Sequence, residues 1–325
     1  MVSETNSKKI LVTGGAGFIG SHLVEDLLQL GHEVRVLDNF STGKRQNLIG
    51  LGSGKWSAGR DFEVIEGDIR DPETVRKATA GVRAVFHEAA LGSVPRSVAD
   101  PVTTHQVNAD GTLNVLLAAR DSHARRVVYA SSSSVYGDSQ RLPKREGEEG
   151  LPLSPYALTK QVNELYGALF MRLYGLETIG LRYFNVYGPR QDPESEYAAV
   201  IPRFVSALLG GGAPVVYGTG QQSRDFTYVK DVVKANICAL DVPADACGSA
   251  YNVGRGDKVS LLELLQTIQD ILRTKIEPRF EPPRPGDVMH SSADVTLTTG
   301  ALGFKAHYDL RSGLEQSIDW YKKNL

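Results

Sequence analysis

A glycine-rich loop near the start of the chain limits the possible folds more than any other feature. The segment TGGAGFIGSH, residues 13–22, lies between a predicted strand over 8–13 and a predicted helix over 21–31. It carries glycines at three-residue intervals: Gly14, Gly17 and Gly20. Without side chains, the backbone can turn tightly and approach a pyrophosphate at the helix N-terminus. The pattern predicts a dinucleotide-binding βαβ unit.

An acidic residue ends the next predicted strand, which covers residues 32–38. A carboxylate at Asp38 can accept hydrogen bonds from a ribose and would repel a 2′-phosphate, which favours NAD over NADP. Two cations, Lys44 and Arg45, follow in the loop and could hold such a phosphate. Asp38 could also serve only as a turn residue. Asp68, after a third strand, could contact the adenine amino group or cap the following turn.

Strand and helix patterns alternate through the first half of the chain. Strands are predicted over 8–13, 32–38, 61–68, 83–90 and 125–133, with helices over 21–31, 71–81 and 107–122 and a long surface loop over 41–60. Such alternation predicts a Rossmann-type, doubly wound parallel sheet covered by helices on both faces. Ligands bind beyond the carboxyl ends of such strands. We therefore expect Asp38, Asp68, His87 and Ser131 to Ser134 to meet at one rim.

The pattern changes after about residue 186. Short strands, helices and turns mix there, with a proline-rich connection over 281–287 and a final helix over 309–324. We expect an NAD-binding domain over 1–185 and a smaller C-terminal α/β lobe over 186–325, with the chain free to cross between them.

Composition excludes several classes of function. The 325 residues carry a formal net charge of −2, so nothing indicates a nucleic-acid partner or a membrane surface. Cys238 and Cys247 lack the spacing of a metal site or a disulfide framework, which suggests a reducing, cytoplasmic setting. We expect no metal site, no signal peptide and no membrane span.

Tyr156 and Lys160 stand one helical turn apart in SPYALTK, residues 154–160, so their side chains share a helix face. A free phenol, with a pKa of about 10, is a poor base at neutral pH. A cation about 4 Å away, at an effective dielectric constant of about 20, favours the phenolate by roughly 4 kcal/mol. The alternative without a functional role is an exposed aromatic beside a solvated lysine. The glycine loop and the serine run over 131–134 favour proton transfer.

The chain resembles the extended short-chain dehydrogenases/reductases, and most closely the nucleotide-sugar 4-epimerases. The resemblance covers nearly the whole chain and rests on the motifs TGGAGFIGSH, HEAALGSVPRS, NADGT, SSSSVYG, SPYALTK, LRYFNVYGPRQDP, AAVIPRF, SRDFTYVKDV, YNVG and RPGDVMHSSAD. It implies a Rossmann domain with bound NAD, a smaller lobe that binds a UDP sugar, and a homodimer.

The resemblance also implies roles for individual residues. Tyr156 would be the base for the sugar 4-hydroxyl, Lys160 would tune it and anchor the ribose, and Ser132 would contact the 4-oxygen. Ser133 and Ser134 could share that role. The implied cofactor site consists of Gly14, Gly17, Phe18, Ile19, Gly20, Asp38, Asn39, Ser41, Thr42, Gly43, Asp68, Ile69, Ala89, Ala90, Tyr156, Lys160 and Phe184.

The implied UDP-sugar site consists of Ser93, Ser132, Asn185, Val200, Tyr217, Arg224, Arg284, Asp287 and Ser291. The guanidinium groups of Arg224 and Arg284 suit diphosphate oxygens, although each could form a surface ion pair instead. Asp287 could accept ribose hydroxyls or close a turn. The family gates its sugar pocket three residues before the aspartate of SAD, which is Ser291 here. A small gate admits a 2-acetamido group, which favours UDP-GlcNAc and UDP-GalNAc as substrates.

Other functions compete with this interpretation. The 4,6-dehydratases carry an Asp-Glu pair where this chain has serines, and UDP-glucuronate decarboxylases carry a glutamate at the position of Ser134. UDP-glucose and UDP-galactose could be the main substrates, or UDP-glucuronate the substrate of a 4-epimerase. A catalytically silent NAD-binding regulator is a further alternative, but such proteins typically lose the tyrosine or the lysine.

Overall fold

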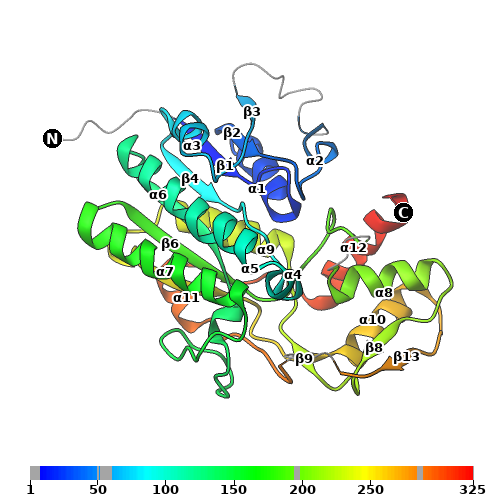
Figure 1. The fold of residues 1–325 in the computed structure, drawn as a ribbon. Coiled ribbons are helices and arrows are strands. Elements are labelled where there is room, and N and C mark those ends of the chain that lie inside the picture. The colour runs from blue at the N-terminus through cyan, green and yellow to red at the C-terminus, as the bar shows by residue number, and fades with distance from the viewer. Residues whose placement is uncertain (1–7, 50, 52–60, 194–197, 284–287, 325) are drawn as a thin grey trace.

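The computed structural model describes residues 8–49, 51, 61–193, 198–283 and 288–324. Its largest element is a seven-stranded parallel sheet with the order β11-β6-β5-β4-β1-β2-β3 (Figure 1). The strands are β1 (Lys9–Thr13), β2 (Glu33–Asp38), β3 (Phe62–Glu66), β4 (Ala84–His87), β5 (Arg126–Ser132), β6 (Glu177–Tyr183) and β11 (Ser249–Val253). The strand order reverses between β1 and β4, where open α/β sheets bind ligands.

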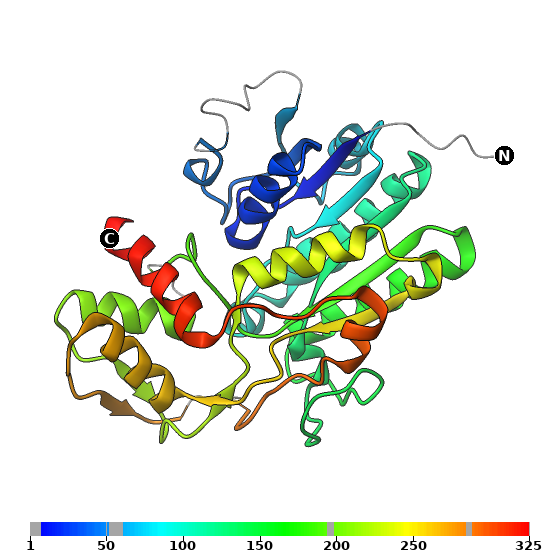
Figure 2. The ribbon, with the colours of Figure 1, turned by 180° about the vertical axis from the view of Figure 1, so that it is seen from behind.

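Helices cover both faces of this sheet, as Figure 2 shows from behind. One face carries α1 (Phe18–Gln29), α9 (Val229–Leu240) and α11 (Thr296–Leu302). The other carries α3 (Pro72–Thr79), α6 (Gly111–Asp121) and α7 (Pro155–Tyr174). Each face buries its own apolar core against the strands. The predicted doubly wound Rossmann architecture is confirmed.

Local sequence signals explain where several helices begin. Asp71 accepts a hydrogen bond from the Glu73 amide ahead of Pro72, as expected for the start of α3. Ser154 caps α7 in the same way, and Pro155 is its first residue. The helix predicted over 107–122 is divided, because a π-helical turn over Gln106–Asp110 precedes α6. Short helices in the first half are α2 (Gln46–Ile49), α4 (Val94–Ala99) and α5 (Pro101–His105).

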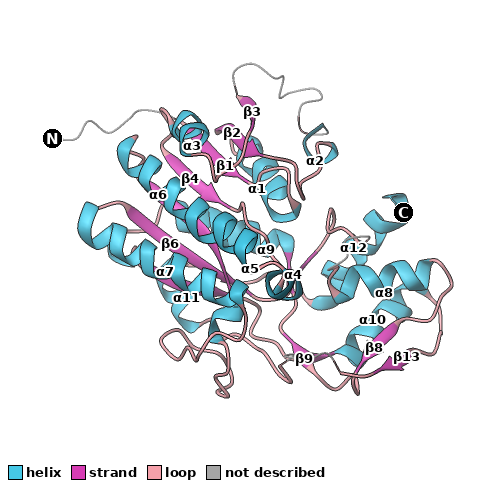
Figure 3. Cartoon of the chain, in the orientation of Figure 1, coloured by secondary structure: helices cyan, strands magenta, loops and turns pink. Residues whose placement is uncertain are grey.

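A smaller lobe lies beside the carboxyl ends of the sheet (Figures 1 and 3). Its helices are α8 (Val200–Leu209), α10 (Leu261–Leu272) and α12 (Leu310–Asn324). Its strands, with those that lead into it, are β7 (Val186–Tyr187), β8 (Val215–Tyr217), β9 (Ser223–Arg224), β10 (Thr227–Tyr228), β12 (Val259–Ser260) and β13 (Arg279–Glu281). A separate apolar core joins α8, α10 and α12.

The two lobes exchange segments. Although α9, β11 and α11 come after residue 186, they pack on the large sheet, and β11 pairs with β6. The chain therefore returns from the smaller lobe to the sheet more than once. The division at residue 185 into an NAD-binding domain and a substrate-binding lobe stays a prediction. Among the described residues, no helix has the length and apolar character needed to cross a membrane.

Candidate active site

A cavity of about 620 Å³ opens at the carboxyl ends of the central strands. Every residue expected to hold the cofactor lines it except Phe184. Phe184 is fully buried and packs with Val135, Tyr136 and Ala293. Residues 13–20, the end of β2 and the start of α7 thus meet around one space, although they lie far apart in the sequence.

The glycine loop forms one wall of this cavity. A Cβ atom on Gly20 would lie 2.2 Å from the Gly14 carbonyl oxygen, so the loop and helix backbones touch. Gly14 has φ +68°, and a side chain there would meet the Ala89 backbone. Helix α1 begins at Phe18, after the N-cap residue Gly17, without a capping side chain and without acidic residues in its first turn. Its N–H groups therefore suit an anion such as the diphosphate of NAD.

Asp38 lines the part of the cavity where we expect a ribose of the cofactor. Its carboxylate accepts hydrogen bonds from the backbone amides of Ala16 (2.9 Å) and Phe40 (2.8 Å). Burial raises the pKa of Asp38, and these two amides oppose that shift. A carboxylate has lone pairs beyond those two bonds, so it can also accept ribose hydroxyls. A 2′-phosphate would face this charge.

The two cations of the loop have acidic partners. Lys44 pairs with Asp192 at 3.0 Å, and Arg45 pairs with Glu66. Both ion pairs oppose recruitment of a 2′-phosphate, so the residues present fit NAD. At the far end, Asp68 accepts from the Asn39 amide at 2.8 Å and pairs with Arg70. The bonds from Arg70 hold the pKa of Asp68 at about 2.

Tyr156 and Lys160 both line the cavity, but they are arranged differently from the sequence expectation. The Lys160 ammonium donates to the Ala130 carbonyl at 2.7 Å and lies 5.9 Å from the Tyr156 ring centroid. Burial raises the pKa of Tyr156, although a hydrogen bond with Ser132 opposes the shift. Burial also lowers the pKa of Lys160 to about 8. The expected lowering of the phenol pKa is absent here, because desolvation of the phenolate is the largest influence and the Glu88 carboxylate adds to it.

The serine run forms the end of β5 and the turn after it. Ser131 lines the cavity and donates to the Glu164 carboxylate. Ser132 accepts from the Ser134 amide at 3.1 Å, and a hydrogen bond from Ser132 is among the influences that lower the pKa of Tyr156. Ser133 lies in this turn, and the Ser134 hydroxyl is buried without a hydrogen-bond partner. The turn thus presents Ser132 to the phenol.

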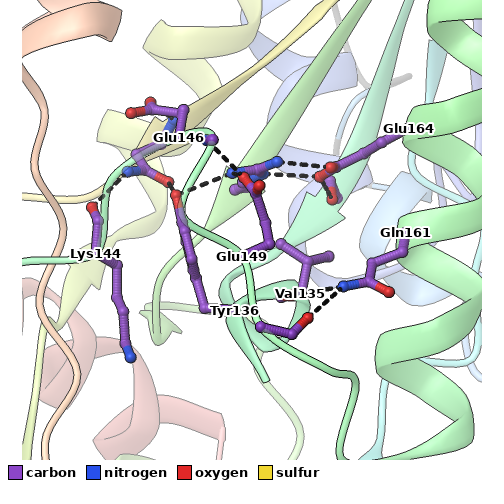
Figure 4. Close-up of polar contacts among 12 residues, drawn as sticks. Val135, Tyr136, Lys144, Glu146, Glu149, Gln161 and Glu164 are labelled. Atoms are coloured by element: carbon purple, nitrogen blue, oxygen red, sulfur yellow. Dashed lines mark hydrogen bonds and ion pairs between the residues drawn. The ribbon is translucent and has the colours of Figure 1, made fainter. Parts of the chain in front are cut away.

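An ion network contacts this turn through Ser131 and Tyr136 (Figure 4). Arg182 binds both carboxylate oxygens of Glu164, at 2.9 and 2.7 Å, and also pairs with Glu149. Its guanidinium donates to the Tyr136 hydroxyl at 3.0 Å. That hydroxyl donates to Asn252 at 2.6 Å. Bidentate arginine–carboxylate geometry fixes orientation as well as distance, so the serine turn rests on a rigid base.

The same network reaches the segment that carries Ser291. The Asn252 amide donates to the carbonyls of Lys144 and Asp294, both at 2.9 Å. Lys144 pairs with Ala293 through a backbone bridge. The 137–153 loop therefore links the serine turn of the large domain to residues 290–294.

His87 does not reach the rim, contrary to the expectation for residues that follow strands. Its side chain is buried between Thr13 and Thr112, with ring nitrogens 2.7 and 2.9 Å from their hydroxyls. Burial lowers its pKa to about 3, so the imidazole is neutral. The next residue, Glu88, lines the cavity instead. The side-chain alternation of a strand could have indicated this exchange, which sequence reasoning missed.

A second cavity, of about 610 Å³, lies in the smaller lobe. Four of the expected substrate residues line it: Asn185, Val200, Tyr217 and Arg224. Ser93 lies outside it and caps α4, where it accepts from the Arg96 amide. Ser291 is buried, and its amide donates to the Ser223 carbonyl at 3.1 Å, next to Arg224. Arg284 and Asp287 lie outside the described residues.

The chain is similar to known proteins in sequence and in fold. The NAD dependent epimerase/dehydratase family matches residues 10–254. A putative UDP-glucose 4-epimerase of Methanocaldococcus jannaschii is 39% identical over 317 residues, which cover 97% of this chain and 99% of the relative.

Two solved structures are also similar. A UDP-N-acetylglucosamine 4-epimerase from Methanobrevibacter ruminantium, in complex with UDP-N-acetylmuramic acid, is 40% identical with a TM-score of 0.91, covering 98% of this chain and 99% of its own. A UDP-glucose 4-epimerase from Thermotoga maritima, with UDP-glucose, is 35% identical with a TM-score of 0.90, covering 97% and 99%.

Proposed function

The chain belongs to the NAD dependent epimerase/dehydratase family, and we propose from this that it interconverts UDP-GlcNAc and UDP-GalNAc. It is an NAD-dependent UDP-sugar 4-epimerase in the broader sense that its relatives share. One observation carries the proposal: Tyr156 and Lys160 line the dinucleotide cavity together with Ser131, at the start of the serine run. The second cavity, with Arg224, offers room for the UDP portion.

Different residues of the chain bind the cofactor, transfer the proton and position the sugar. The glycine loop and Asp38 would hold NAD, which would supply a hydride acceptor and donor for C4 of the sugar. Tyr156 takes the proton of the 4-hydroxyl and returns it after the 4-keto sugar has turned over. Ser132 holds the 4-oxygen beside the phenol, and Ser133 is the alternative. Lys160 supplies a positive charge beside the phenol, which favours the phenolate.

The remaining residues of the expected site are assigned to binding. Asn185, Val200, Tyr217 and Arg224 would contact the nucleotide diphosphate or the sugar, supported by their shared cavity. Ser93 would approach the sugar from the start of α4. Arg284 and Asp287 are assigned by their motif alone.

The choice of an acetamido sugar rests on Ser291 and on the relative from Methanobrevibacter ruminantium. We expect Ser291→Tyr to reduce kcat/KM for UDP-GlcNAc by at least about tenfold more than for UDP-glucose. A phenol ring would fill the space that a serine leaves, and a clash of this kind costs about 1–3 kcal/mol. Steady-state kinetics with both sugars measure the ratio. Ser291→Ala, which keeps the pocket open, is the matched control, and equal losses for both sugars would remove the gate from the proposal.

A panel of four UDP sugars tests the function itself. Purified protein is incubated with UDP-GlcNAc, UDP-GalNAc, UDP-glucose or UDP-galactose, and the 4-epimer is separated from the substrate. The proposal expects an equilibrium mixture from the N-acetylated pair without net NADH. Turnover of only the plain pair would favour UDP-glucose epimerisation, the activity of the relative from Thermotoga maritima. No turnover of any sugar would favour a silent NAD-binding regulator.

We also propose that two copies of the chain pair through α7. This helix exposes Leu158, Leu165, Leu169 and Leu173 along one side. Val98 and Val102, on α4 and α5, are about 65% exposed beside it. A second copy would bury this apolar surface. Large exposed apolar patches generally mark sites of interaction with another molecule.

The two free cysteines support a cytoplasmic location.

Charges on the exposed side of α7 should separate the dimer. We expect a Leu165→Glu/Leu169→Glu double variant to sediment as a single chain at concentrations where the unmodified protein sediments as two. Burying two unpaired carboxylates opposes association strongly. Analytical ultracentrifugation measures the mass, with Leu30→Glu, directly after α1, as the control outside the patch. An unmodified protein of single-chain mass would contradict the dimer.

A further inference from the structure

Glu88 is a cavity carboxylate for which the mechanism above has no role. We propose that Glu88 is a positioning residue that sets the charge state of the Tyr156–Lys160 pair. The proposal deepens the epimerase function and rests on it. Glu88 follows the last residue of β4 and lines the cavity together with both members of the pair.

A short hydrogen-bond chain fixes the Glu88 carboxylate. The Tyr183 hydroxyl, from the end of β6, donates to Glu88 Oε1 at 2.7 Å. The Asn236 side chain, on α9, donates to that hydroxyl at 2.8 Å and to the Val232 carbonyl at 3.0 Å. Tyr183 and Asn236 are both buried. The carboxylate is therefore held at the cavity wall by a built arrangement that spans a strand and a helix.

Among the residues that the structure describes, Glu88 and Glu164 are the carboxylates that face the pair, and Glu88 has no cation among its hydrogen-bond partners. Glu164 also faces Lys160, but Arg182 binds both of its oxygens. Glu88 instead accepts from the neutral phenol of Tyr183. Tyr156 faces Glu88 and the Ser132 hydroxyl, and the imidazole of His87 is neutral. A change of charge at Glu88 thus acts on the pair directly.

The direction of this effect follows from the charges. Burial raises the pKa of Glu88 to about 7. Above that pH its carboxylate raises the pKa of Lys160, keeping the ammonium, and raises the pKa of Tyr156, opposing the phenolate. Below that pH the carboxyl is neutral and both influences are lost. Replacement of Glu88 by a neutral group should therefore lower both pKa values, and only above pH of about 7.

The test uses variants of the full-length protein. In Glu88→Gln we expect the alkaline limb of the kcat/KM profile to move down by about one pH unit. The pKa of Tyr156 should fall by a similar amount. The tyrosinate absorbance of cofactor-free protein reports that value, after subtraction of the same titration in a Tyr156→Phe background. Glu88→Asp restores the charge and should lie near the unmodified protein. Glu73→Gln, on the exposed face of α3, is the control for loss of any carboxylate.

Two results would overturn the role of Glu88. One is a Tyr156 titration that is the same in Glu88→Gln and in the unmodified protein. The other is equal behaviour of Glu88→Asp and Glu88→Gln, which would indicate packing instead of charge. Circular dichroism verifies that each variant is folded. Because the absorbance titration needs no turnover, it judges Glu88 even if the unmodified protein epimerises none of the four sugars.

Discussion

Tyr156→Phe is expected to reduce epimerase turnover by roughly 10²–10⁴-fold, the usual contribution of a positioned acid–base group. The substitution removes only the phenolic oxygen that bonds to Ser132 and would take the sugar proton. The ring stays, so the helix and cavity should persist. Steady-state rates with UDP-GlcNAc measure the loss, and the nucleotide released on denaturation verifies that the cofactor site is intact.

Tyr166→Phe is the matched control, because Tyr166 lies on the same helix and packs against Phe170 away from the cavity. It should retain near-normal turnover. If Tyr156→Phe also kept near-normal turnover, the proton would have to move through another group, and the proposed mechanism would fail. A loss in both variants would point to damage to α7 in general.

The second large effect is expected at the glycine loop. Gly20→Ala should yield protein that has lost most of its NAD, and with it most of its activity. The added methyl carbon would lie 2.2 Å from the Gly14 carbonyl oxygen and 2.9 Å from Gly15 Cα, both backbone atoms. Neither can rotate away as a side chain would, so the loop must shift from the start of α1. Denaturation followed by chromatography measures the nucleotide per chain.

The unmodified protein serves as the reference and should release NAD and little NADP. Gly300→Ala in α11, where an added methyl would meet open space, is the control and should retain the nucleotide. A Gly20→Ala protein with a full complement of NAD would show that the loop is not the diphosphate site. Release of mainly NADP from the unmodified protein would contradict the role given to Asp38.

The fold was largely predictable because its signals are local. Apolar strands, helix caps such as Asp71 and the glycine loop all lie within short windows of sequence. The return of α9 and β11 to the large sheet depends instead on which apolar faces pack together. A short window of sequence does not indicate this long-range packing. The chain that links Glu88, Tyr183 and Asn236 joins three elements distant in sequence. Only the tertiary fold brings them together.

The pKa shifts of the site residues were harder to predict from the sequence than the identity of those residues. Sequence reasoning identified Tyr156 and Lys160 from their spacing and estimated their attraction from charge alone. The cost of burying a phenolate depends on how much of the cavity wall surrounds it, which the sequence does not state. Two carboxylates add to that balance: Glu88, which follows β4, and Glu164, which lies on the same helix as the pair.

The exchange of segments between the lobes has a consequence for engineering. A module that recognises a new sugar could not be transplanted as one contiguous cassette, because α9, β11 and α11 interrupt the smaller lobe and complete the NAD-binding sheet. A chimera would need junctions on both sides of each interruption.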